Sequence, residues 1–213
     1  MGKSTMIREI SKHYSVISTA STGISAVNIN GATIDSTLRL NDSQKDFKEN
    51  MKSIKTQLDK VDNEEDDEEK IRELHLMKSD ILVIDEISMI DGVKFDEIIE
   101  RINIINELRE KNLILIICGD VLQLPPINSI SGYFFYAHNF DEFSKNSYKC
   151  KLDEVKRQNN QDFIKMLQRI RIGTYEKDDI TTIKRMKNNI VDENEAVHLC
   201  AKNVDVDSIN KHF

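Results

Sequence analysis

Short continuous runs of hydrophobic residues alternate along this chain with segments in which hydrophobic residues recur at helical spacing. A helical pattern over residues 4–12 leads into a run rich in β-branched side chains at residues 14–19. Two more apolar runs, residues 81–84 and 113–118, are each followed within two positions by an acidic residue. Runs of this kind predict strands buried on both faces, as a parallel sheet requires.

A crossover helix is predicted between the last two runs. Its hydrophobic residues recur at helical spacing: Phe95, Ile98, Ile99, Ile102 and Ile105. The order helix, strand, helix, strand, helix, strand then predicts an α/β fold with a mainly parallel sheet.

Polar segments interrupt this pattern at two places. Ser21-Thr22-Gly23 ends the first strand, and its hydroxyl groups predict the cap of a short helix that runs through Ala26. Residues 41–78 are rich in Lys, Glu and Asp and nearly free of aromatic side chains. We expect this second segment to be a solvated helical excursion or a mobile insert.

The C-terminal third of the chain contains three further elements. The aromatic residues 133–136 are expected to fill the core, although an aromatic platform for stacked bases is an alternative. A helix is predicted over residues 162–172 and ends at Gly173, and residues 197–200 predict a short strand.

Length and composition limit the classes of protein that fit. A chain of 213 residues with 39% hydrophobic residues can form one full α/β domain and part of another. The net charge of −7 argues against binding nucleic acid through bulk positive charge, but a groove of amides, hydroxyls and a few cations stays open. The three cysteines form no CxxC pair, which favours an intracellular protein without a zinc site, and no run is long enough to predict a membrane span.

The first candidate functional residues lie at the N-terminus and directly after the second predicted strand. Gly2-Lys3-Ser4 matches the end of the phosphate-binding pattern GxxxxGK[ST], in which backbone amides and Lys hold phosphates and Ser holds Mg²⁺. Asp85 and Glu86 follow an apolar strand, where an acid can meet Mg²⁺ and a water molecule. Either signal alone has a plain alternative: a chance tripeptide, or a solvated pair of acids.

The third apolar strand is followed by the string Gly-Asp-Val-Leu-Gln-Leu-Pro-Pro. Gln123 in this string could be aimed at a γ phosphate, whereas the alternative is a turn that the prolines end. Arg157 lies further along the chain, and its guanidinium could neutralise charge on a transferred phosphoryl group. The alternative for Arg157, taken by itself, is that it is a surface cation without a catalytic role.

Together these segments resemble the Pif-type DNA helicases of superfamily one, which with the RecD-like enzymes move 5′ to 3′ on single-stranded DNA. The resemblance covers nearly the whole chain except the charged insert. It rests on ordered motifs at residues 2–5, 21–36, 80–91, 117–127, 152–173 and 198–210. It implies a RecA-like P-loop NTPase domain whose first strand is missing, and the start of a second RecA-like domain.

The resemblance also implies roles for individual residues. ATP would be bound by Gly2, Lys3, Ser4, Thr5 and Asp85, and Mg²⁺ would be held by Ser4 and Asp85. The implied catalytic residues are Glu86, Gln123 and Arg157. The residues that would contact single-stranded DNA are Ser21, Thr22 and Gly23. Hydroxyl and amide donors of the latter kind need no net positive charge.

Two departures from the family pattern change the expectations. Asp35 stands where the family usually has His. The DNA contact of that His is therefore not carried over to this chain, and an acid at this position would repel phosphate. The chain begins inside the phosphate-binding motif, and the later motifs of the second motor domain are missing. We therefore expect a partial chain with weak or no ATP turnover by itself.

The domain organisation follows from the same motifs. We expect a first motor domain over residues 1–175 that includes the insert 41–78, a connection over 176–196, and the start of the second domain over 197–213. The insert is a candidate counterpart of a wedge-like subdomain in the family.

Two other functions stay open: a non-catalytic DNA- or partner-binding fragment, and a P-loop ATPase of repair or mobile elements that does not unwind DNA.

Overall fold

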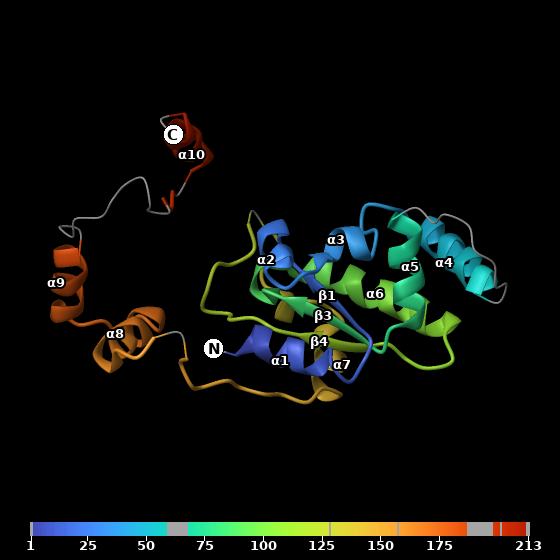
Figure 1. Ribbon diagram of the computed structural model, residues 1–213, viewed down its shortest axis with the longest axis horizontal. Coiled ribbons are helices and arrows are strands. Elements are labelled where there is room, and N and C mark those ends of the chain that lie inside the picture. The colour runs from blue at the N-terminus through green and yellow to red at the C-terminus, as the bar shows by residue number, and fades with distance from the viewer. Residues whose placement is uncertain are drawn as a thin grey trace. The chain divides into compact units, whose positions relative to one another are not determined.

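The computed structural model describes residues 2–58, 68–127, 129–156, 158–186, 198–200 and 202–211. Contacts divide the chain into two compact units, Met1–Asn159 and Asn160–Phe213. The first unit contains the sheet labelled in Figure 1 and the helices around it.

Four parallel strands form the sheet of the first unit: β1 (Val16–Ala20), β2 (Ala32–Thr33), β3 (Ile81–Asp85) and β4 (Ile114–Ile117). Their order is β2-β1-β3-β4, and all three pairings are parallel. The predicted α/β class with a parallel sheet is therefore confirmed. The carboxyl ends of β1 and β3 lie side by side, because Ala20 pairs with Asp85.

The two faces of β3 are covered by different helices, which explains its continuous apolar sequence. Every residue of β3 is buried. Ile81 and Val83 pack on one face with Ile7 of α1 (Lys3–Ile10), whereas Leu82 and Ile84 belong to the larger core on the other face. The third apolar run was also predicted to be buried on both faces, and this prediction is wrong. This run forms β4, which is an edge strand, and Ile114 is 51% exposed.

The larger core is built around α6 (Gly92–Leu108), the predicted crossover helix. Asp91 caps this helix by accepting a hydrogen bond of 2.9 Å from the Lys94 amide. Phe95, Ile98 and Ile105 are fully buried on its inner face.

The charged insert consists largely of α4 (Gln44–Leu58) and α5 (Glu68–Lys78), so its helical character is confirmed. Its expected solvation is wrong for one face. Phe47, Met51 and Ile54 of α4 are buried in the same core as α6. An amphipathic helix needs only one apolar residue per turn to bury a stripe, which the high Lys and Glu content conceals.

The aromatic segment forms η2 (Phe134–Tyr136), and α7 (Phe140–Lys145) follows it. The Phe134 ring lies 5.8 Å from the Phe95 ring and 5.5 Å from the Phe140 ring, measured between centroids. The predicted core role is confirmed for Phe134. Tyr136 instead is 71% exposed.

The second unit contains α8 (Gln161–Arg171), α9 (Lys177–Met186) and α10 (Asn203–Asn210). Arg169 joins α8 to α9 through Asp179, with 2.9 Å between Arg169 Nε and Asp179 Oδ2. The strand predicted at 197–200 is wrong for its described residues, 198–200, which carry no strand. A single strand without a neighbour gains no ladder hydrogen bonds, and the described strands all belong to the sheet of the first unit.

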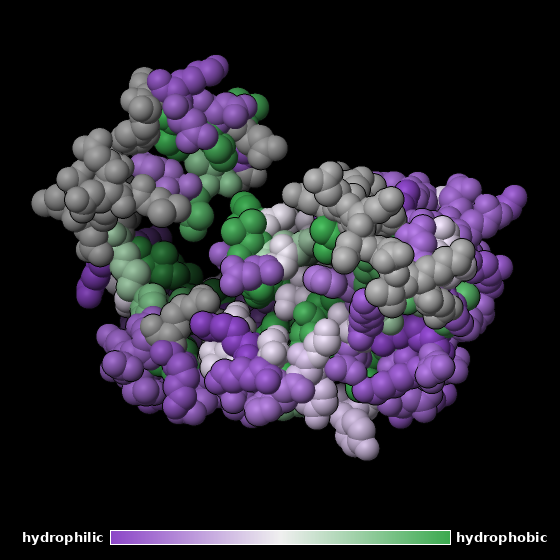
Figure 2. All heavy atoms as spheres, turned by 45° about the vertical axis from the view of Figure 1, so that its right-hand side comes forward, coloured by the Kyte–Doolittle hydropathy of each residue, from purple (hydrophilic) through white to green (hydrophobic). Residues whose placement is uncertain are grey.

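The surface agrees with the composition. Hydrophilic side chains dominate the face shown in Figure 2, as expected for a chain with 31% charged residues. Of the described helices, none combines the length and apolar character needed to cross a bilayer.

Candidate nucleotide-binding site

The candidate site begins at the first turn of α1, which places Lys3 beside the carboxyl end of the sheet. Gly2 precedes the helix, and its carbonyl accepts a hydrogen bond of 2.8 Å from the Met6 amide. Ser4 and Thr5 follow in the same turn and are exposed. The amides in the first turn of a helix and its macrodipole favour an anion at this end.

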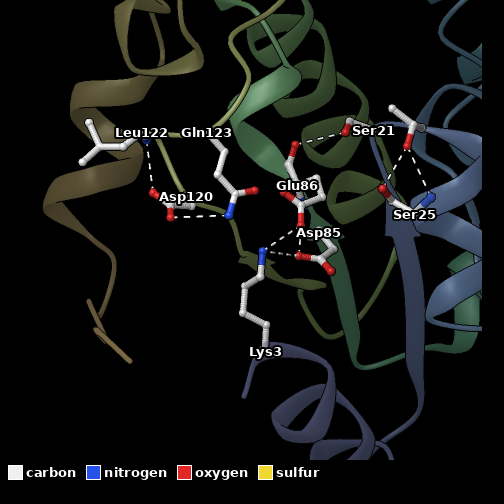
Figure 3. A network of polar contacts seen from close by, with 9 residues as sticks. Lys3, Ser21, Ser25, Asp85, Glu86, Asp120, Leu122 and Gln123 are labelled. Atoms are coloured by element: carbon white, nitrogen blue, oxygen red, sulfur yellow. Dashed lines mark hydrogen bonds and ion pairs between the residues drawn. The ribbon is translucent and has the colours of Figure 1, made fainter. Parts of the chain in front are cut away.

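Lys3 joins this helix to the two acids that follow β3. Its Nζ lies 2.9 Å from Glu86 Oε1 and 3.3 Å from Asp85 Oδ1, and these contacts are drawn in Figure 3. Burial alone would lower the pKa of Lys3. The hydrogen bond to Glu86 and the charges of both acids outweigh burial and raise the pKa, so Lys3 stays protonated.

Glu86 is positioned by an uncommon backbone conformation. Its φ is 53° and its ψ is 45°, in the left-handed region. The Glu86 amide donates to Asp85 Oδ1 at 2.9 Å, and the Ser21 hydroxyl donates to the Glu86 carbonyl at 3.0 Å. These bonds hold a turn that directs the Glu86 carboxylate toward Lys3.

The loop after β4 approaches the same turn very closely. A Cβ atom on Gly119 would lie 2.8 Å from Ile87 Cγ2 and 3.0 Å from the Ile87 nitrogen. Asp120 holds the loop by accepting from the Leu122 amide at 3.1 Å and from Gln123 Nε2 at 3.5 Å. Figure 3 shows Gln123 extending from this loop on the side of the site where Glu86 and Lys3 meet.

Burial makes the thiol of Cys118, which directly follows β4, unreactive. Burial raises the pKa of Cys118 to about 11, and the negative charge of Asp85 acts in the same direction. Only a thiolate is a good nucleophile, so Cys118 serves as a packing residue here.

The three residues expected to contact DNA lie from the end of β1 to the first residue of α2 (Gly23–Asn28). Ser21 touches the acids, since its amide donates to the Asp85 carbonyl at 3.3 Å in addition to its hydroxyl bond with Glu86. Thr22 caps α2 by accepting from the Ser25 amide at 3.3 Å, and it donates to the Ser25 hydroxyl at 2.9 Å. Gly23 begins the helix and is exposed.

Asp35 is neutralised by a neighbouring helix. Its Oδ1 lies 2.7 Å from Lys94 Nζ of α6. The repulsion expected between this acid and phosphate is therefore reduced by a cation that the local sequence around Asp35 does not reveal.

The structure brings together most, but not all, of the predicted site. Lys3, Asp85 and Glu86 are in contact, and Gln123 lies on the adjoining loop. Ser4 shares the first turn of α1 with Lys3, and Arg157 lies outside the described residues. Sequence reasoning assigned Asp120 no part in positioning Gln123, although it stands in the same Gly-Asp string, where a short acidic side chain can accept from amides two residues on.

Comparison with known proteins gives a consistent set of relatives. A sequence profile of the AAA domain family matches residues 1–195. The chain is 30% identical to the ATP-dependent DNA helicase PIF1 of Emericella nidulans, over 98% of this chain and 28% of that protein. It is 29% identical to the Xenopus laevis protein of the same name, over 92% of this chain and 30% of that one. The chain thus spans less than a third of the length of these relatives.

Solved structures show the same likeness in three dimensions. The Pif1 helicase of Candida albicans superposes with a TM-score of 0.76 at 27% identity, over 99% of this chain and 48% of that chain. Bacteroides Pif1 bound to single-stranded DNA superposes with a TM-score of 0.69 at 26% identity, over 99% of this chain and 50% of that chain. These matches confirm the RecA-like fold predicted from the motifs.

Proposed function

This chain belongs to the AAA domain family and, within it, to the Pif1-type group, and we propose from that premise that it is the first motor domain of an ATP-dependent DNA helicase. In this proposal, hydrolysis of the β–γ bond of ATP drives 5′-to-3′ translocation on single-stranded DNA. The relatives are named ATP-dependent DNA helicases, and the family resemblance seen in the motifs is confirmed.

The observation that carries the proposal is the contact of Lys3 with both acids at one edge of the sheet. Lys3 lies far along the chain from these two adjacent acids, since Lys3 and Glu86 are separated by 83 positions. A triphosphate bound at the first turn of α1 would compete with Glu86 for the Lys3 ammonium. Glu86 would then be free to orient a water molecule and accept its proton, and Gln123 would sense the γ phosphate.

The residues present fit Mg²⁺ together with a nucleotide. Asp85 is buried, and the ion pair and hydrogen bond of its carboxylate given above both fall on Oδ1, which leaves Oδ2 available to a cation. Within the described part of the chain, no three His, Cys, Asp or Glu side chains form a metal cluster. Mg²⁺ would therefore be held by Ser4 and Asp85 with phosphate oxygens, and when bound it would neutralise charge on the phosphates.

Single-stranded DNA is the proposed partner, and Ser21, Thr22 and Gly23 are its proposed contacts. A groove that uses hydroxyl and amide donors suits a chain with a net charge of −7. Arg157 remains the proposed arginine finger.

Binding and turnover measurements on variants test this proposal. Lys3→Ala should weaken affinity for a non-hydrolysable ATP analogue by at least about tenfold, because a charged hydrogen bond to phosphate is lost. Glu86→Gln should keep analogue binding and lower any DNA-stimulated turnover by about 10²-fold or more, because it removes a general base. Lys12→Ala is the matched control, since Lys12 also lies near α1 but pairs with Glu9 at the surface, at 2.6 Å.

Three outcomes separate the alternatives. Analogue binding that is equal in Lys3→Ala and in the unsubstituted chain contradicts the nucleotide site. Oligonucleotide binding without analogue binding supports the non-catalytic alternative. DNA-stimulated hydrolysis that does not separate a forked duplex, in a protein that also carries the second motor domain, supports an ATPase that does not unwind.

A further inference from the structure

Ser21 links the segment proposed to contact DNA with the residue proposed to activate water. The Ser21 hydroxyl donates to the Glu86 carbonyl at 3.0 Å, and the two residues are 65 positions apart in the sequence. Figure 3 shows this bond bridging the end of β1 and the turn after β3. The neighbouring hydroxyl of Thr22 differs, because its bonds stay within the first turn of α2.

The chemistry of the Ser21 hydroxyl allows only one of two bonds at a time. A serine hydroxyl carries one proton, and the oxygens of a DNA phosphodiester can only accept hydrogen bonds. Ser21 is partly exposed, so a phosphate can reach it. If Ser21 donates its proton to phosphate, it loses its bond to the Glu86 carbonyl.

Loss of that bond removes one restraint on the backbone of Glu86. The residue is held in the left-handed region at a φ of 53°, which disfavours side chains with a Cβ atom. Four contacts restrain it: the Ser21 hydroxyl and the Met89 amide at its carbonyl, Asp85 at its amide, and Lys3 at its carboxylate. Losing the Ser21 bond leaves the carbonyl with only the local Met89 amide, at 3.2 Å, which loosens the turn and the hold of the Glu86 carboxylate on Lys3.

We propose that Ser21 is a positioning residue whose single proton is exchanged between the Glu86 carbonyl and a DNA phosphate, so that DNA binding frees Lys3 for the triphosphate. This inference rests on the proposed function and deepens it. It states how the two ligands are coupled: the strand of DNA and ATP each bind more tightly when the other is bound, by the same factor.

Thermodynamic coupling in four versions of the full chain tests the proposal: the unsubstituted chain, Ser21→Ala, Ser21→Thr and Ser147→Ala. The dissociation constant of a fluorescent, non-hydrolysable ATP analogue with Mg²⁺ is measured with and without saturating oligo-dT. Ser147→Ala is the matched control, because the Ser147 hydroxyl also donates to a backbone carbonyl, that of Phe143 at 2.5 Å.

In the unsubstituted chain, oligo-dT should tighten analogue binding by about fivefold or more. Ser21→Ala should bind the analogue without DNA as tightly as the unsubstituted chain does with DNA, and oligo-dT should add nothing further. A purely structural loss would weaken binding, so tighter binding is the distinctive result. Ser21→Thr and Ser147→Ala should keep the coupling of the unsubstituted chain.

Other results overturn the proposal in distinguishable ways. Coupling that persists in Ser21→Ala, analogue binding that weakens in Ser21→Ala without DNA, or independent binding of the two ligands removes this inference alone. An unsubstituted chain that binds neither ligand removes the proposed function as well. If Ser21→Ala does not fold, hydrogen exchange of the unsubstituted chain decides: oligo-dT must speed exchange in the turn at residues 85–89, and unchanged exchange refutes the link.

Discussion

At the scale of single residues, Glu86 combines backbone strain with a carboxylate that contacts Lys3. A left-handed conformation would suit glycine better, but glycine would lack the carboxylate that contacts Lys3. Such strain persists only where surrounding contacts fix it, which Ser21 and Asp85 do here. The proposed role of Glu86 in ATP hydrolysis would account for a residue other than glycine at this strained position.

Gly119 gives a prediction at the same scale. A Cβ atom at this position would lie 2.8 Å from the Ile87 side chain and 3.0 Å from the Ile87 nitrogen, so Gly119→Ala must displace the loop or the turn. We expect a loss of about 1–3 kcal/mol in the free energy of unfolding, as for other overpacked sites. Urea unfolding measures it, and Gly23→Ala is the control for stability, because a Cβ atom there meets nothing within 4 Å.

At the scale of elements, the insert is part of the core of the first unit. Phe47 of α4 is fully buried, and the Arg101 guanidinium of α6 lies 4.6 Å from the centre of its ring. Arg101 also donates to the carbonyl of Ser43 at 3.3 Å, just before α4 begins. These contacts fix the apolar face of α4 on α6.

Phe47→Ala tests this packing. We expect a loss of about 3–5 kcal/mol in the free energy of unfolding, because a large buried ring leaves a cavity. Lys45→Ala in the same helix should stay within about 0.5 kcal/mol, because its side chain is 81% exposed and its pair with Glu49 spans 3.8 Å. Equal stability of the two variants in thermal and urea unfolding would show that α4 does not contribute to the core.

We expect the pairing of α8 with α9 to depend on pH. The hydrogen bond from Arg169 lowers the pKa of Asp179 to about 2, and the Glu176 amide helps by donating at 2.9 Å. A lowered pKa in the folded state means that this contribution is complete above the ordinary value of 3.8 and is lost as the pH falls toward 2.

Asp179→Asn should remove this dependence. We expect the helical signal in circular dichroism of the unsubstituted chain to decrease between about pH 4 and pH 2 as the pairing of α8 with α9 is lost. The variant should start with less helix at pH 5 and change less over this range. The same acid-induced change in both proteins would contradict a role for the Asp179 carboxylate.

At the scale of the whole molecule, the chain consists of two units with different contents. The sheet, both hydrophobic clusters and the contacts of Lys3 with the acids all lie within Met1–Asn159. The boundary at residue 175, drawn from the motifs, remains a prediction about motor domains, which are defined by ancestry rather than by density of contacts.

A fragment of residues 1–159 should therefore fold by itself. We expect cooperative thermal unfolding at a midpoint within a few degrees of that of the first unit in the full chain, since its core is internal. Differential scanning calorimetry of both proteins measures the midpoints. A fragment that melts without a cooperative transition would show that residues 160–213 stabilise the sheet.

The sequence predicted an element correctly where that element depends on interactions between residues close together in the chain. β3, α6 and the cap at Thr22 were foreseen because apolar runs, helical spacing and capping residues act within a few positions. The exposed edge of β4 was missed, because strand order depends on pairing across the sheet. The buried face of α4 was missed because its acidic and basic residues outnumber its buried ones.

The sequence by itself determined the fold class and the residue types of the candidate site, since Lys3, Asp85 and Glu86 follow recognisable patterns beside predicted elements. Only the tertiary structure decided that Lys3 contacts both acids, that Ser21 donates to the Glu86 carbonyl and that Lys94 neutralises Asp35. The physical reason is distance along the chain. Each of these contacts joins residues at least 59 positions apart, and such pairs meet only when the strands have taken their order in the sheet.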